Sequence, residues 1–142
     1  MSPARTSSPR TQVPRLRIGL KHQVVKRVPF ELTIAHYDPR LPAVFSTPAM
    51  IGMMETAAAL AVQPKLAPGT ITVGTRIEVD HLKAVGVGAE VSARARLTEI
   101  DGRFLTFEVE ARAGHEIIGR GRVFRAIVEP KGFHEKAKSR RS

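Results

Sequence analysis

Cysteine is absent from this chain of 142 residues, so disulfide bonds and thiolate zinc sites are excluded. No apolar run reaches the roughly 18 residues that a membrane-spanning helix needs. The N-terminus also lacks the apolar segment of a secretory signal. These absences predict a cytoplasmic protein without a membrane anchor. The length predicts one domain that can bury a core without covalent staples.

Acidic residues are missing from the first 30 positions, which carry seven Lys and Arg. Residues 31–128 carry eleven basic and eleven acidic residues, so the net charge of +10 arises at the two ends. A neutral body with basic ends does not resemble a basic DNA-binding face. We expect a disordered basic leader at 1–16, a domain at 17–130 and a solvated basic tail at 131–142. Nucleic-acid binding through the tails is the less favoured alternative.

Several motifs of well-known enzymes are also lacking. The chain has no Walker loop, no dinucleotide glycine fingerprint, no G-x-S-x-G elbow and no His-Glu-x-x-His. Its five histidines show no metal-ligand spacing. We therefore expect neither a metal site nor a cofactor.

What the chain does contain is a long apolar helix signal. Thr47 followed by Pro48 predicts an N-cap and a first helical residue, and prolines and glycine after residue 63 predict the end near residues 63–66. Glu55 is the only charge in the segment 46–62. Small or polar residues form a single stripe along the helix, at Gly52, Glu55, Thr56, Ala59 and Gln63.

Alternating patterns predict strands on both sides of this helix. The expected strands cover residues 19–28, 70–81, 90–97, 103–111 and 117–129, and a short helical turn lies within 29–45. Ile71, Val73, Ile77 and Val79 should share one face of their strand. A three-residue loop ending at a left-handed Gly102 should place Arg94 opposite Glu108. The order strand, helix and four-strand meander predicts an α+β fold with one helix on one antiparallel sheet.

Three residues within this frame can carry chemistry, although each also has a structural explanation. Glu55 can be an exposed residue in the N-terminal half of the helix, His81 a structural histidine at a strand end, and Thr47 an N-cap. The expected geometry links the three residues. The helix lies on the sheet and can contact the inward face of the strand whose last residue is His81. A partly buried glutamate beside a histidine would form a general-base pair.

Four segments together resemble the hotdog-fold thioesterases related to the fluoroacetyl-CoA thioesterase. They are "VFSTPAMIGMMETAA", "GTITVGTRIEVDHLKAVGVGAEV", "LTEIDGRFLTFEVEA" and "IIGRGRVFRAIV", and the resemblance covers about residues 17–130. It implies an antiparallel sheet wrapped around one long central helix. The catalytic residues that it implies are Thr47, Glu55 and His81. The substrate-binding residues that it implies are Gly74, Arg125, Leu41 and Phe45.

The resemblance further implies hydrolysis of an acyl-CoA or related thioester by a homodimer or a dimer of dimers. Glu55 and His81 would activate water or support a covalent intermediate, and Thr47 would orient the carbonyl or act as the nucleophile. Asp38 and Leu41 stand where the family has aromatic gating residues, so selectivity for fluoroacetate is not expected. The alternative is a non-catalytic acyl-CoA-binding module of the same fold.

Overall fold

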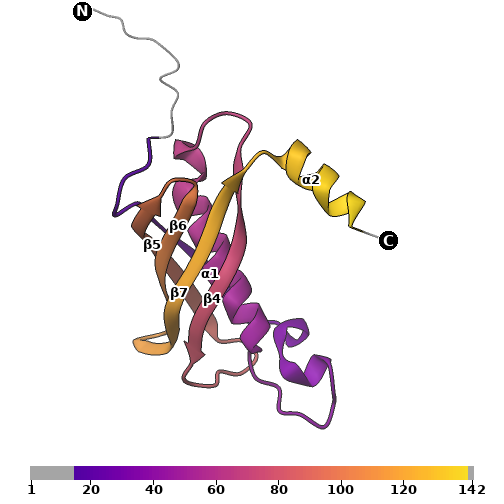
Figure 1. Cartoon of the computed structure of the whole chain (residues 1–142). Coiled ribbons are helices and arrows are strands. Elements are labelled where there is room, and N and C mark those ends of the chain that lie inside the picture. Colours follow the sequence, from indigo (N-terminus) through magenta and orange to yellow (C-terminus); the bar gives the residue numbers. More distant parts are fainter. Residues whose placement is uncertain (1–14, 141–142) are drawn as a thin grey trace, which may run out of the picture.

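The structure, a computed structural model, describes residues 15–140. The main helix and all five strands lie where the sequence predicts them, and Figure 1 shows the helix behind the sheet. The elements are β3 (Lys21–Arg27), the 3₁₀ helices η1 (Phe30–Leu32) and η2 (Ile34–His36), α1 (Thr47–Val62), η3 (Gln63–Lys65), β4 (Ile71–His81), β5 (Glu90–Asp101), β6 (Phe104–Ala113), β7 (Glu116–Val128) and α2 (Pro130–Ser139).

The five strands form one antiparallel sheet in the order β3-β5-β6-β7-β4. Short turns join β5, β6 and β7 into a meander, but β4 pairs with β7 and not with β5. The prediction of a four-strand meander is therefore wrong for β4. Residues 82–89, which follow β4, are too many for a tight hairpin turn and lead the chain across the sheet to β5. As a result β4 is an edge strand, paired on one side only within the described chain.

The core lies between α1 and the inner face of the sheet. Met50, Met54, Ala57 and Ala58 of the helix are fully buried against apolar side chains of the strands, among them Phe107. Each such side chain stabilises the fold by roughly 25 cal/mol for every Å² of apolar surface removed from water. Within the small and polar stripe of α1, Gly52, Thr56 and Gln63 are exposed, whereas Glu55 and Ala59 are half-buried. The α+β fold with one central helix is thus confirmed.

The N-cap of α1 is Ser46, so the prediction that Thr47 caps the helix is wrong by one residue. The Ser46 hydroxyl oxygen accepts a hydrogen bond from the Ala49 amide at 3.2 Å. Serine and threonine are both good caps, and the proline after Thr47 is tolerated at the second helical position as well as the first. Because Ser46 supplies the cap, the Thr47 side chain is available for another contact.

The hairpin between β5 and β6 also differs from the prediction. Its turn holds two residues, not three, although Gly102 has the expected left-handed φ of 61°. A turn with an even number of residues would by itself direct the apolar residues of the two strands to opposite faces of the sheet. A bulge at Thr98 restores the common face, and Arg94 pairs with Glu110 in place of Glu108.

A second bulge, at Thr75 in β4, changes which residues face the helix. The sequence pattern places Ile71 and Val73 on the same face as Val79. The bulge reverses the alternation, so Ile71 and Val73 lie on the outer face while Val79 packs against the core. The same reversal directs Gly74 towards α1.

The two ends of the chain differ in what the structure describes. Residues 1–14 of the expected leader lie outside the described residues. Leu16, which the prediction places in the leader, packs against the core, and the Arg15 amide donates to the Lys65 carbonyl at 2.9 Å. The expected tail forms α2, in which every residue is exposed, and Figure 1 shows α2 projecting beyond β4. Residues 130–139 are therefore exposed and helical, which the sequence did not indicate.

Within residues 15–140, no helix is long and apolar enough to cross a membrane. No three His, Cys, Asp or Glu side chains in this range gather closely enough to hold a metal ion.

Candidate active site

Thr47 and His81 meet where the start of α1 lies against the end of β4. The Thr47 hydroxyl oxygen lies 2.7 Å from Nδ1 of His81. A hydroxyl donates to Nδ1 when the imidazole carries its proton on Nε2. In that arrangement the imidazole can take the hydroxyl proton and activate the oxygen as a nucleophile.

The pair borders a hollow of about 270 Å³, whose wall includes the buried ring of Phe45. Nε2 of His81 is buried and has no hydrogen-bond partner among residues 15–140. Buried polar atoms in native proteins nearly always have partners. Nε2 therefore lacks the hydrogen-bond partner that a buried polar atom usually has.

Glu55 lies on the side of α1 that faces β4 and β7, where it forms an ion pair with Arg125. Oε1 of Glu55 is 2.6 Å from Nη1 of Arg125, and the two side chains are 27% and 10% exposed. Arg125 also donates from Nε to the Thr72 hydroxyl and from Nη2 to the Thr72 carbonyl, both at 2.8 Å. A buried guanidinium is stabilised only when its charge and its hydrogen bonds are satisfied, and these contacts satisfy both.

Gly74 stands directly against the Glu55 carboxylate. A Cβ at position 74 would collide with Oε2 of Glu55. The φ of Gly74 is not among the positive ones, so a side chain at position 74 would displace the Glu55 carboxylate without straining the backbone. Oε2 is also the carboxylate oxygen that Arg125 does not bind.

Within one chain these residues form two separate clusters. Thr47 and Glu55 are eight residues apart on α1, which corresponds to about 12 Å along the helix. Gly74 and His81 are seven residues apart on β4, roughly 20 Å along the strand. The expectation that Glu55 lies beside His81 is therefore wrong within one chain. The cause is the length of α1 and β4 between the two ends of the site.

The other two predicted substrate residues differ in their positions. Phe45 lines the hollow, whereas Leu41 is exposed on the preceding loop and is not part of the wall. Asp38 on the same loop binds Arg40 at 2.8 Å, and this side-chain hydrogen bond lowers the pKa of Asp38 below its usual value. The loop thus presents a charged pair where the resemblance implies an aromatic residue.

The first turn of α1 offers one free backbone donor to a substrate. Pro48 has no N–H, and the Ala49 amide is bound by the Ser46 hydroxyl. Among the first three residues of α1, Thr47 is therefore the one whose backbone amide can donate a hydrogen bond to a developing oxyanion. The positive end of the helix dipole adds to its effect.

Two residues that hold the site in place were not predicted. Ser46 frees Thr47 by capping the helix, and a serine directly before Thr-Pro is a signal that could have indicated it. Thr72 orients Arg125, but a threonine within an alternating strand carries no such signal.

A five-stranded antiparallel sheet around one long helix, with a threonine–histidine pair at the helix start, defines a hotdog-fold protein of the thioesterase class. The family model for fluoroacetyl-CoA-specific thioesterases matches residues 28–131. The chain belongs to this family, and the resemblance seen in the sequence is confirmed.

Two individual relatives agree with this assignment, and a third solved structure shares the fold. The fluoroacetyl-CoA thioesterase of Streptantibioticus cattleyicolor is 34% identical over 131 residues, which is 88% of this chain and 94% of the relative. A solved structure of the fluoroacetyl-CoA thioesterase FlK has a TM-score of 0.83 at 33% identity and covers 89% of this chain and 98% of its own. A hot-dog-like protein from Thermanaerovibrio acidaminovorans, 22% identical, has a TM-score of 0.79 with coverage of 96% and 98% and shows the shared fold.

Proposed function

We propose that this protein hydrolyses acyl-CoA thioesters to the free acid and CoA. The observation that carries the proposal is the 2.7 Å contact between Thr47 and His81 at a hollow, with the buried Nε2 of His81 lacking a partner in residues 15–140. Family membership supports it, because the 34% identical relative is a fluoroacetyl-CoA thioesterase. Variants of FlK have also been solved with fluoroacetate and with acetyl-CoA.

The chemistry follows from the groups at the start of α1. The thioester carbonyl lies in the hollow, with its oxygen near the Thr47 amide. Nδ1 of His81 takes the proton of the attacking hydroxyl, which belongs to Thr47 or to a water bound beside it. The carbonyl oxygen gains negative charge as the hydroxyl attacks, and the Thr47 amide stabilises it. The imidazolium then returns the proton to the departing CoA thiolate. When Thr47 is the nucleophile, the acyl group is left as an ester on its hydroxyl oxygen, and a water deprotonated by Nδ1 of His81 hydrolyses that ester to the free acid.

We further propose that the protein is a homodimer joined through β4. An edge strand of eleven residues with unpaired backbone groups is a strong template for pairing with a second copy. Antiparallel pairing of two β4 strands sets the start of one beside the end of the other. Gly74 and Glu55 of one subunit then lie next to His81 of the other. Oε2 of Glu55, which Arg125 does not bind, accepts a hydrogen bond from the Nε2–H of His81 and completes the site.

This composite site predicts complementation between two inactive variants. Glu55→Gln and His81→Ala chains are each inactive alone, but a mixed dimer combines the intact Glu55 of one chain with the intact His81 of the other. Equal co-expression should restore about a quarter of wild-type activity, since half of the dimers are mixed and each has one intact site of two. Activity that stays at the level of the single variants refutes the composite site. A monomer in light scattering at micromolar concentration refutes the dimer.

The proposed activity is tested with a panel of acyl-CoA substrates of increasing chain length. The hollow of about 270 Å³ is small for a ligand site, so short acyl groups should be the best substrates. Binding of acyl-CoA without release of CoA across the panel would favour the non-catalytic binding module. A cytoplasmic location, to be checked by cell fractionation, stays a prediction, and so does assembly of two dimers.

A further inference from the structure

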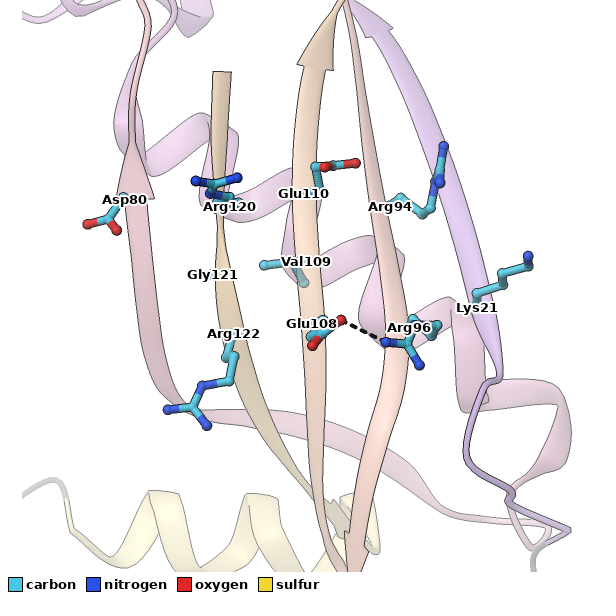
Figure 2. Close-up of a pocket in the computed structure, with 10 residues that line it drawn as sticks. All are labelled: Lys21, Asp80, Arg94, Arg96, Glu108, Val109, Glu110, Arg120, Gly121 and Arg122. Carbon is cyan, nitrogen blue, oxygen red and sulfur yellow. Dashed lines mark hydrogen bonds and ion pairs between the residues drawn. The ribbon is translucent and has the colours of Figure 1, made fainter. Parts of the chain in front are cut away.

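Two arginines outside the catalytic clusters each bind both oxygens of a carboxylate. Arg40 donates to the two oxygens of Asp38, from Nε at 3.1 Å and from Nη2 at 2.8 Å. Arg112 donates from the same two nitrogens to Glu110, at 2.9 Å and 3.4 Å, and Figure 2 shows Glu110 on the face of the sheet away from α1. Such paired hydrogen bonds are favoured because the guanidinium edge matches the carboxylate in shape. In both pairs the arginine occupies both carboxylate oxygens.

Arg125 uses the same edge of its guanidinium for Thr72 and not for Glu55. Nε donates to the Thr72 hydroxyl oxygen and Nη2 to the Thr72 carbonyl oxygen, both at 2.8 Å. Nη1 alone donates to Glu55, and it reaches Oε1 at 2.6 Å. Oε2 therefore has no bond to the arginine, and it is the oxygen that lies against Gly74.

The backbone of the sheet fixes this arrangement. Thr72 pairs with Ile127 and Gly74 pairs with Arg125 across β4 and β7, so the threonine acceptors lie on the strand beside the arginine. Thr72 and Arg125 are both buried. A buried N–H that loses its acceptor cannot turn to water without cost, and it will be satisfied by another protein group if one is near. The nearest such group here is the Glu55 carboxylate.

We propose that Thr72 is a positioning residue that keeps Oε2 of Glu55 available for catalysis. Without the Thr72 hydroxyl, the guanidinium would turn its free edge to Glu55 and bind both carboxylate oxygens, as Arg40 and Arg112 do. The inference rests on the proposed function, in which Oε2 accepts a hydrogen bond from His81 of the partner subunit. Thr72 touches neither the substrate nor the reacting atoms, and it acts through Arg125 and Glu55.

The first test is Thr72→Val, which keeps the shape of the side chain and removes the acceptor. It should lower kcat on an acyl-CoA substrate at least about tenfold with little change in KM, because a misplaced catalytic group slows the reaction without weakening binding. Thr72→Ser restores the hydroxyl and should regain most of the activity. Thr106→Val is the matched control. Thr106 is 8% exposed against 6% for Thr72, and its hydroxyl has no hydrogen-bond partner within residues 15–140, so kcat should not change.

The second test repeats Thr72→Val in a Glu55→Gln chain. If Thr72 acts through the Glu55 carboxylate, the double variant keeps the kcat of Glu55→Gln within about twofold, because two residues that act as a unit are not additive. A merely structural role of Thr72 lowers kcat by the same factor in both backgrounds. That outcome overturns the inference, and so does a Thr72→Val enzyme as fast as the wild type or a Thr72→Ser enzyme as slow as Thr72→Val.

A crystal structure of the Thr72→Val protein gives a readout that does not depend on activity. Arg125 bound to both oxygens of Glu55 supports the inference, and Arg125 still bound to Oε1 alone overturns it. A wild type that hydrolyses no thioester overturns the proposed function instead, and the contacts of Arg125 in this crystal structure still decide whether Thr72 controls the pairing.

Discussion

Replacing Glu55 by glutamine separates a catalytic role of this carboxylate from a structural one. The substitution removes the charge and keeps the volume. Arg125 keeps both of its hydrogen bonds to Thr72, and the glutamine amide oxygen can still accept one from Nη1. The fold should therefore survive, while the carboxylate that completes the His81 site in the partner subunit is lost.

Two magnitudes follow from these contacts. Weakening one charge-assisted hydrogen bond while the amide still accepts should lower the free energy of unfolding by roughly 1 kcal/mol. For a domain of this size that corresponds to a fall in Tm of about 3–5 °C. Loss of a positioned carboxylate should lower kcat by at least about 10²-fold. A factor of that size is about 2.7 kcal/mol of transition-state stabilisation.

The assay follows release of the CoA thiol with a thiol-reactive dye, and the absence of cysteine means that the protein adds no background. Thermal unfolding is measured on the same samples. Glu108→Gln is the matched control, because Glu108 also forms an ion pair with an arginine but lies on the outer face. It should change neither kcat nor Tm by much, since an exposed pair contributes about 0–1 kcal/mol.

The outcome that refutes the catalytic assignment is a Glu55→Gln enzyme that turns over within about twofold of the wild type. If Tm falls at the same time, the pair with Arg125 is structural only. A loss of kcat with an unchanged dimer and nearly unchanged Tm supports the role in catalysis.

Three further predictions concern other parts of the chain. Thr47→Ala should lower kcat at least about 10²-fold without loss of Tm, and Thr47→Ser should retain much activity. Ser46→Ala removes the helix cap and should instead lower the free energy of unfolding by about 1 kcal/mol, measured by chemical denaturation. Gly74→Ala should lower kcat at least about tenfold, because its Cβ displaces the carboxylate that it faces, and unchanged steady-state kinetics would contradict this. A chain without residues 1–14 and 130–142 should keep its Tm and kcat, since α2 is exposed throughout, and loss of folding on truncation would show that the ends support the core.

Local sequence patterns were sufficient to predict the helices and strands that depend on short-range periodicity. Apolar residues around a helix signal gave α1, and alternation gave all five strands within a few residues. Glu55 was identified as the only charge in the helix segment, on its small or polar stripe, because a lone charge among apolar residues is visible without a structure. Specific motifs at consistent spacing indicated the family.

The tertiary structure alone decided the features that depend on distant partners. The bulges at Thr75 and Thr98 change which residues share a face, and a bulge follows from the fit between strands and not from the composition of either one. The position of β4 at the edge depends on its pairing with β7, which is formed some 40 residues later in the chain. The distance between Glu55 and His81 is set by the packing of α1 along β4. Sequence spacing can place two residues on facing surfaces, but only the packed elements fix which ends of those surfaces meet.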